Sequence, residues 1–347
     1  MKINIISCFL GLACFCLSSW TVYAAPRAQI DSKSADPYMG AIVIDADTGQ
    51  IFFEDHSDVK GYPASILKMM DLLICLEKIN AGVMRLDEKI TVSAEASKMG
   101  GSQVFLKENE IFTVDELLYA CMVQSANDAA TALAIHAAGS KERFVALMNQ
   151  RARELGMKST EFHSIHGLPP AKGQLPDVTT ARDLTRLARE LLKYPDCLRY
   201  TSCRERMFRD NKFEMRNHNQ LLWSFPGCDG FKTGYFTKAG YSIVATAKRD
   251  NSRVIAVVLG STSKKLRNSK AAELLTMGFA MAPEKPVVIP AATNVAGQPI
   301  KEIKQEEQRR GSAIWLVLSI TVLVVLAGAI YWVFFYRPDN NDLVQKH

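Results

Sequence analysis

Two uncharged apolar stretches, one near each end of the chain, most constrain how this sequence can fold. Residues 313–336 contain no Asp, Glu, Lys or Arg, and the run exceeds the roughly 20 residues that a helix needs to cross a bilayer. Trp315 lies near its start and Tyr336 ends it, as in the aromatic belts at membrane interfaces. We therefore expect a transmembrane helix over 313–336, with the folded body before it.

The N-terminal stretch has the layout of a secretory signal. Lys2 precedes an uncharged run over 3–22, and small residues follow around Ala24. Signal peptidase reads this order of charged, apolar and small residues, so we expect residues 1–24 to be a cleaved signal peptide.

The two ends together predict where the body lies. A signal peptide would export it to the periplasmic or extracytoplasmic side, anchored in the cytoplasmic membrane, with a short cytoplasmic tail over 337–347. Arg309 and Arg310 lie on the outer side of the predicted helix, against the usual excess of positive charge inside. We expect the signal peptide to set the orientation because it inserts first.

Residues 25–282 have the composition of one globular domain. Hydrophobic residues make up 48% of the chain and charged residues 22%, an ordinary balance. The formal net charge of +6 would suit nucleic acid only if Lys and Arg gathered on one face. The basic segment 204–216 interleaves them with acidic residues, so we expect no nucleic-acid partner. The stretch 283–312 is Pro-rich and then charged, which predicts a linker.

Hydrophobic patterning predicts strands at both ends of the body and helices between them. Asp45 to Gly49 separates two apolar runs as a hairpin turn, and Thr113 with Glu116 forms a capping box that begins a helix. Further strands and helices follow from the same patterns. The predicted strands cover 41–44, 51–53, 241–247 and 254–259, and the other predicted helices cover 65–79, 128–138 and 268–281. The expected fold class is mixed α/β.

The cysteines leave one question open. Eight occur, and three of them lie in the predicted signal, so five remain. An odd number leaves at least one thiol without a partner in the same chain. Cys197 and Cys203 are close in sequence, and an exported protein can meet an oxidising environment, so a bridge between them is possible.

The strongest chemical signal begins at Ser65 and Lys68. They are three residues apart in a predicted helix, so their Cβ atoms lie on one face, about 5–6 Å apart. A serine nucleophile needs a base, and a lysine serves when burial or a nearby cation lowers its pKa. This pattern alone often occurs by chance. Two further motifs strengthen it, namely Ser125-Ala126-Asn127 and Lys232-Thr233-Gly234.

In this order, the three motifs resemble the SxxK, SxN and KTG set of penicillin-binding proteins and class A β-lactamases. Further segments over about 38–281 are similar to the low-molecular-mass D-alanyl-D-alanine carboxypeptidases. These segments are Pro63 to Met70, Gln124 to Ala130, Leu155 to Met157, His166 to Leu168, Thr180 to Asp183, Asn219 to Leu222 and Asp229 to Tyr235. The resemblance implies an antiparallel sheet packed against a helical lobe, with the nucleophile at a helix start between them.

The resemblance also implies a reaction. Ser65 would attack the terminal D-Ala-D-Ala bond of a peptidoglycan stem peptide and form an acyl-enzyme, while Lys68 takes its proton. Ser125 would relay a proton to the leaving amine, and Asn127 would hold Lys68 or the substrate amide. β-Lactam antibiotics would acylate the same serine as covalent inhibitors. No cofactor or metal is implied.

Substrate binding is implied for residues on and around the third motif. Lys232, which is also expected to take part in catalysis, would bind the terminal carboxylate together with Thr233. The backbone N–H groups of Ser65 and Tyr235 would form an oxyanion hole. The other substrate-binding residues expected from the resemblance are Gly234, His166 and Arg267.

Two residues depart from the family pattern. Phe236 stands where threonine is common, and His218 stands where arginine is common, so we expect recognition of the carboxylate to differ. The small β-rich domain that often follows the catalytic one has no counterpart between Met281 and the apolar run.

Other functions compete with hydrolysis of D-Ala-D-Ala. A class A β-lactamase shares the three motifs but needs a Glu in an ExxLN pattern, and Glu161 has a suggestive position without the rest. A scaffold that binds wall peptides without turnover would keep the same motifs. A transpeptidase differs only in the acceptor that it admits to the acyl-enzyme.

Overall fold

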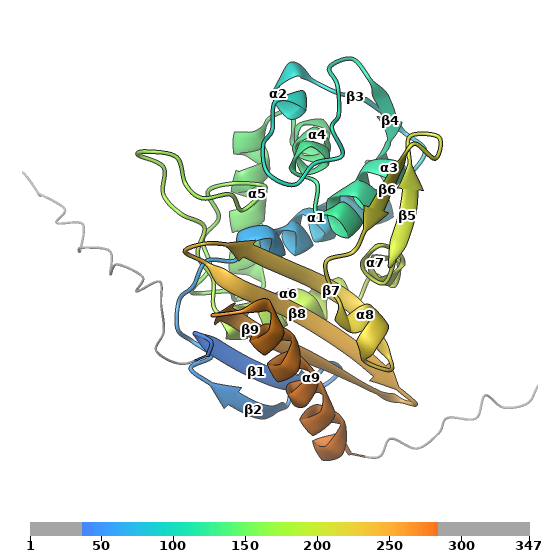
Figure 1. The fold of residues 1–347 in the computed structure, drawn as a ribbon. Coiled ribbons are helices and arrows are strands. Elements are labelled where there is room, and N and C mark those ends of the chain that lie inside the picture. Colours follow the sequence, from blue (N-terminus) through green and yellow to red (C-terminus); the bar gives the residue numbers. More distant parts are fainter. Residues whose placement is uncertain (1–36, 284–347) are drawn as a thin grey trace, which may run out of the picture. The chain divides into compact units, whose positions relative to one another are not determined.

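The computed structural model of the chain describes residues 37–283. The predicted signal peptide, the predicted transmembrane helix, the predicted tail and nearly all of the predicted linker lie outside these residues. Within residues 37–283, no helix combines the length and the apolar character needed to cross a membrane. A helical lobe lies against an antiparallel sheet (Figure 1), so the predicted mixed α/β class is confirmed.

The sheet has five strands in the order β2-β1-β9-β8-β7. They are β1 (Gly40–Asp45), β2 (Ile51–Asp55), β7 (Cys228–Phe236), β8 (Gly240–Arg249) and β9 (Ser252–Ser261). The N-terminal hairpin joins the C-terminal strands through antiparallel pairing of β1 with β9, with Ala41 opposite Val258. The Asp45 carboxylate accepts hydrogen bonds from the N–H groups of Asp47 and Thr48 in the hairpin turn. Both predicted strand pairs are therefore confirmed.

The helices fill the sequence between these strands and also follow the last one. They are α1 (Lys68–Asn80), α2 (Ala94–Ser97), α3 (Val114–Tyr119), α4 (Asn127–Ala138), α5 (Lys141–Glu154), α6 (Ala181–Leu191), α7 (Asp196–Thr201), α8 (Leu221–Ser224) and α9 (Lys264–Met281). Two short hairpins complete the described part, β3 (Lys89–Thr91) with β4 (Ile111–Thr113), and β5 (Glu205–Phe208) with β6 (Phe213–Arg216). The capping box at Thr113 is formed as predicted.

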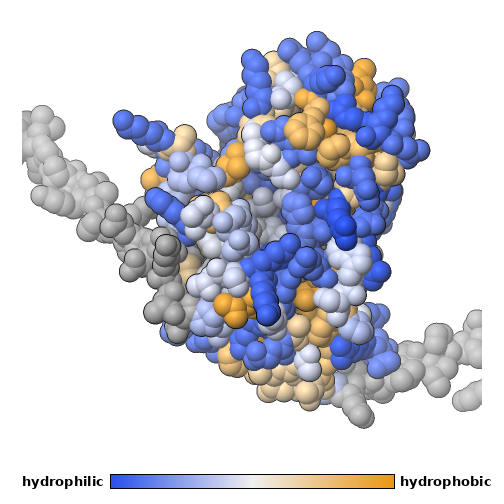
Figure 2. Space-filling model, viewed as in Figure 1, coloured by the Kyte–Doolittle hydropathy of each residue, from blue (hydrophilic) through white to orange (hydrophobic). Residues whose placement is uncertain are grey.

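Both faces of the sheet are buried. Ile42 and Ile44 point into the core shared with the helical lobe, whereas Ala41 and Val43 join the core beneath α9. Successive strand residues face opposite sides, so a strand covered on both sides reads as continuously apolar. Hydrophilic side chains cover most of the face seen in Figure 2, with small hydrophobic groups over the helical lobe and over α9.

Some predictions need correction. The helix expected over 65–79 has two parts, because a 3₁₀ turn, η1 (Ala64–Leu67), carries Ser65 and the α-helix starts only at Lys68. Helix α9 begins at Lys264, four residues before its predicted start. Cys197 and Cys203 are both free thiols, as are the other cysteines within 37–283.

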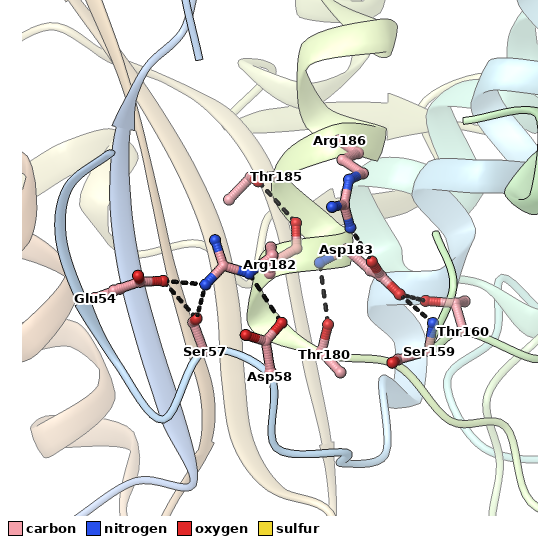
Figure 3. Close-up of polar contacts among 10 residues, drawn as sticks. All are labelled: Glu54, Ser57, Asp58, Ser159, Thr160, Thr180, Arg182, Asp183, Thr185 and Arg186. Carbon is pink, nitrogen blue, oxygen red and sulfur yellow. Dashed lines mark hydrogen bonds and ion pairs between the residues drawn. The ribbon is translucent and has the colours of Figure 1, made fainter. Parts of the chain in front are cut away.

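The Thr180 to Asp183 segment begins α6 (Figure 3). The Thr180 hydroxyl accepts a hydrogen bond from the N–H of Asp183 at 3.1 Å, which caps the helix. The Asp183 carboxylate accepts bonds from the N–H of Ser159 at 2.8 Å and from the hydroxyl of Thr160 at 3.0 Å. This segment therefore ties α6 to the loop after α5, and its polar residues are structural.

Candidate active site

Ser65 lies where the helical lobe meets β7. The carbonyl of Pro63 approaches the strand so closely that a Cβ on Gly234 would lie 2.4 Å from its oxygen. Only glycine fits there without moving backbone. The glycine of the Lys-Thr-Gly motif therefore lets β7 pass directly against the turn that carries the nucleophile.

Lys68 is fully buried beneath this turn, with no exposed surface. Its amine donates hydrogen bonds to Ser65 Oγ at 3.1 Å, to Asn127 Oδ1 at 2.7 Å and to the carbonyl of His166 at 2.9 Å. Burial lowers the pKa of Lys68 because the ammonium loses its hydration. A neutral amine at this distance from Ser65 can accept the hydroxyl proton.

Ser125 and Lys232 form a second serine–lysine pair. The π-helical turn η2 (Ala120–Gln124) ends at Ser125, which has the left-handed backbone angles φ 61° and ψ 31°. Non-glycine residues hold this conformation only where their surroundings enforce it. Lys232 Nζ donates to Ser125 Oγ at 2.9 Å. Burial, together with the positive charge of Lys68, lowers the pKa of Lys232 to about 7.

Asn127 ties a loop to the site. Its side-chain amide donates to the carbonyl of Gly100 at 2.7 Å, and its backbone N–H donates to the carbonyl of Ser102 at 2.7 Å. The same residue accepts from Lys68, so the SxN asparagine both holds the base and fixes one wall of the cleft. Sequence reasoning did not identify Gly101 or Ser102, which line that wall.

Asp177 is a second supporting residue that sequence reasoning missed. Its buried carboxylate accepts bonds from the N–H groups of His163 at 2.6 Å and Ser164 at 2.8 Å. The Ser164 hydroxyl in turn accepts from the N–H of Gly167. This network shapes the loop that presents the His166 carbonyl to Lys68. No local motif marks Asp177, because its partners lie more than ten residues away.

A cleft of about 450 Å³ runs past the nucleophile. Lys68 and Lys232 lie beneath its floor, with exposures of 0% and 2%. The structure therefore brings the three motifs together around one space. The predicted site residues that line the cleft are Ser65, Ser125, Asn127, Thr233, Gly234, Tyr235 and Arg267.

Arg267 and His166 contribute in different ways. Arg267 is 3% exposed, and burial lowers its pKa to about 10, so it remains a cation at neutral pH. His166 places its carbonyl against Lys68, its imidazole accepts a bond from the N–H of Leu168, and the residue lines a neighbouring cavity. His166 is thus not among the residues that line the cleft, and its role in substrate binding stays a prediction.

The two departures from the family pattern also line the cleft. Phe236 packs against Tyr62, with ring centroids 5.6 Å apart. Desolvation, together with the charge of Lys232, lowers the pKa of His218 to about 4, so its ring is neutral at pH 7. Lys264, another cation that sequence reasoning missed, lines the cleft beside it.

Comparison with known proteins agrees with this geometry. Residues 22–263 match the family model for D-alanyl-D-alanine carboxypeptidase. This chain belongs to the D-alanyl-D-alanine carboxypeptidase family. Within that family, it is 36% identical to D-alanyl-D-alanine carboxypeptidase DacF of Bacillus subtilis, over 82% of this chain and 73% of the relative. It is 35% identical to DacC of Escherichia coli, over 82% and 71%.

Solved structures show the same relationship. Penicillin-binding protein D2 from Listeria monocytogenes, in its ampicillin-bound form, is 30% identical to this carboxypeptidase family member, with a TM-score of 0.64. The match covers 71% of this chain and 99% of that protein. D-alanyl-D-alanine carboxypeptidase DacD from Francisella tularensis has a TM-score of 0.66 at 29% identity, covering 78% and 79%. The family predicted from the sequence motifs is confirmed.

Proposed function

We propose that this chain removes the terminal D-Ala from peptidoglycan stem peptides as a serine-type carboxypeptidase. The observation that carries the proposal is the contact of Ser65 Oγ with the buried amine of Lys68 at 3.1 Å. Burial lowers the pKa of this amine, which favours the free base that can accept the hydroxyl proton. The family to which the chain belongs supports the substrate.

The acylation step follows from these contacts. Neutral Lys68 takes the Ser65 proton as the oxygen attacks the carbonyl of the penultimate D-Ala. The backbone N–H groups of Ser65 and Tyr235 stabilise the negative charge that develops on the carbonyl oxygen. Ser125 passes a proton to the departing amine, and Lys232 orients the Ser125 hydroxyl. Thr233 and Arg267 hold the terminal carboxylate at the cleft wall.

Water then hydrolyses the acyl-enzyme. β-Lactams would trap the enzyme at this stage, because the opened ring stays attached to Ser65. A class A β-lactamase needs a further general base, a Glu carboxylate, to activate that water. Glu161 does not line the cleft, and it lies 3.2 Å from the imidazole of His163 instead. The structure thus offers no support for Glu161 in such a role.

One pair of measurements tests this function against its alternatives. The protein should release D-Ala repeatedly from a peptide ending in D-Ala-D-Ala. With penicillin, mass spectrometry should detect one long-lived covalent adduct on Ser65. Ser65→Ala should lose both activities while folding normally. Fast hydrolysis of penicillin would indicate a β-lactamase. Binding of peptide without D-Ala release by the folded protein would indicate a scaffold.

Export and anchoring belong to the same proposal. The predicted signal over 1–24 and the predicted helix over 313–336 would place the catalytic domain outside the cytoplasmic membrane, with β-lactams reaching it from that side. A Pro-rich chain extends about 3.1 Å per residue, so the linker over 283–312 would let the domain reach the wall. A shortened chain ending at Ala282 should leave the membrane fraction and still release D-Ala. Membrane retention of that shortened chain would contradict the anchor.

A further inference from the structure

A groove at the C-terminal end of α6 is separate from the active site. Its volume is about 730 Å³, and residues from the β1–β2 turn, α6, α7 and the start of β9 line it. None of them lines the active-site cleft. Another groove, of about 700 Å³, shares His218 and Lys264 with the cleft and therefore belongs to the active site. The separate groove is called the α6 groove below.

The α6 groove and the cleft lie at opposite ends of β9. At the start of this strand, the carbonyl of Arg253 accepts a hydrogen bond from the N–H of Ala46 at 3.0 Å, and both residues line the α6 groove. At the end of the strand, Ser261 pairs with Tyr241, which pairs with Tyr235 of the cleft. A molecule bound in the α6 groove would therefore leave the cleft open to substrate.

Cations outnumber carboxylates in the α6 groove. The cations are Arg186, Arg189, Lys193 and Arg253, and the carboxylates are Asp47 and Glu190. The first three cations recur at helical spacing, so they lie along one side of the end of α6. An excess of one charge on a recessed surface favours a partner of the opposite charge. The α6 groove therefore suits an anionic partner.

Arg189 is held in place without a carboxylate partner among the residues that the structure describes. Its Nε donates to the carbonyl of Ala46 at 3.0 Å, and its Nη2 donates to the carbonyl of Asp47 at 2.7 Å. These bonds orient the guanidinium but do not neutralise it, so the cation is already positioned for an incoming carboxylate. The other three cations each pair with one carboxylate. Arg189 is thus the main contact that the groove offers to an anion.

Three leucines provide the apolar part of the α6 groove. Leu155, Leu192 and Leu198 line it, and each is only partly buried. A single small anion would leave these side chains in water, and it would occupy little of a volume in the range of roughly 300–1,000 Å³ that holds much larger ligands. The combination of cations and leucines suits a polypeptide segment that carries both carboxylates and an apolar side chain.

We propose that the α6 groove binds an acidic segment of another protein, in which large apolar side chains lie between acidic residues. The carboxylates of that segment would contact Arg189 and Lys193, while its apolar side chains pack on the three leucines. The leucines distinguish this partner from a polyanionic polymer, which would bind through charge alone. The proposed reaction does not use this surface, so the inference does not depend on the proposed function.

Fluorescence anisotropy with a labelled peptide tests the α6 groove on the full chain. The probe is Gly-Asp-Glu-Leu-Leu-Glu-Asp-Gly, measured at about 50 mM salt so that screening is weak. It should bind saturably, with a Kd of about 100 µM or lower. A peptide with serine in place of both leucines should bind at least about 5-fold more weakly, because it loses the apolar contact. A peptide with Asn and Gln in place of the acidic residues should also bind at least about 5-fold more weakly.

Two variants locate the binding. Lys193→Glu reverses a charge whose side chain is 70% exposed, so folding should be unaffected, and the affinity for the acidic peptide should fall at least about 5-fold. Arg189→Gln should weaken binding by a similar factor. Lys89→Glu makes the same charge reversal at an exposed position outside the α6 groove and is the matched control. All three variants should react with penicillin within about 2-fold of the wild-type rate.

Each result either supports or overturns the inference. Loss of affinity in both groove variants, with a preference for the leucine peptide, supports it. No saturable binding overturns it. Equal affinity for the serine peptide would indicate a surface for any polyanion, and an equal loss in Lys89→Glu would mean that only the net charge matters; both would overturn the docking site. If folded protein binds the peptide but releases no D-Ala, the carboxypeptidase function fails while the inference stands.

Discussion

Two clusters of cationic side chains in this protein behave in opposite ways. In the active site, Lys68 and Lys232 are buried, and among the described residues neither has a carboxylate within ion-pair distance. Their amines contact hydroxyl, amide and carbonyl oxygens instead. At the start of α6, Arg182 contacts the carboxylates of Asp58, at 2.8 Å, and Glu54 (Figure 3).

The pKa values follow the surroundings. Burial lowers the pKa of Lys68 and of Lys232. The hydrogen bond that Arg182 donates to the Asp58 carboxylate raises the pKa of Arg182 and lowers the pKa of Asp58. Loss of hydration without a directly paired carboxylate lowers the pKa of a lysine, so that it can act as a base. A cation that is directly paired with carboxylates keeps its charge and serves the structure. Within one domain, the active-site lysines therefore serve the chemistry, whereas Arg182 serves the structure.

The largest effect is expected from exchanging the cation type in both clusters. Lys68→Arg keeps the charge but cannot deprotonate, so acylation by penicillin should slow by about 10²- to 10⁴-fold. Arg182→Lys should leave the acylation rate unchanged. Stopped-flow acylation with circular dichroism as a folding check measures both variants. Near-normal acylation by Lys68→Arg would remove this lysine from the role of base.

The next effect concerns stability at the α6 cluster. Asp183 is 2% exposed and accepts bonds from Ser159, Thr160 and Arg186. Asp183→Ala should lower the free energy of unfolding by about 3 kcal/mol, because it leaves buried donors and a cation unpaired. Urea unfolding measures this loss. The acylation rate of the folded fraction should stay at the wild-type value, and a selective loss of acylation would mean that this cluster takes part in the chemistry.

A third prediction uses Asp71, a buried carboxyl near Lys68. Asp71 is 1% exposed, and neither of its carboxyl oxygens has a hydrogen-bond partner. Burial raises the pKa of Asp71 well above its usual value, although the charge of Lys68 opposes the shift. When the pKa of a carboxyl is higher in the folded protein than in the unfolded chain, the protein loses stability as the pH rises above the unfolded pKa, which is about 3.9 for Asp.

Asp71→Asn should therefore stabilise the protein at pH 7 by about 1–3 kcal/mol relative to wild type. The gain should shrink as the pH falls toward 4, because a growing fraction of the unfolded wild-type chain then also binds the proton. Urea unfolding at pH 4.5 and pH 7 tests the difference. A loss of stability at pH 7 would show that Asp71 is ionised and pairs with Lys68, which would make the two clusters alike.

The smallest effect is expected at the exposed edge of the α6 cluster. The Asp58 side chain is 68% exposed, so its pair with Arg182 is screened by solvent, and Asp58→Asn should cost at most about 0.5 kcal/mol. Arg182 lowers the pKa of Asp58, so this contribution is present above the unfolded pKa and disappears as the pH falls through the folded one. A cost that persists at pH 2 would have another origin.

Local patterns predicted much of the fold. The hairpin turn at Asp45, the capping box at Thr113 and the apolar pair of strands near the C-terminal end all formed as expected, because each depends on residues within a few positions of one another. The break between η1 and α1 was missed. The turn that carries the nucleophile packs closely against Gly234, which lies far along the chain, so no local pattern reports its surroundings.

The sequence by itself determined the chemistry of the site, since the SxxK, SxN and KTG motifs specify two serines, two lysines and their order. The sequence also determined the family, because the three motifs and the segments around them resemble those of the D-alanyl-D-alanine carboxypeptidases. Only the tertiary structure decided that both lysines are buried without a directly ion-paired carboxylate, that Asp177 shapes the loop holding the His166 carbonyl, and that the cleft adjoins a larger groove. Burial and hydrogen bonding between distant segments depend on packing in three dimensions, and pKa values follow from that packing.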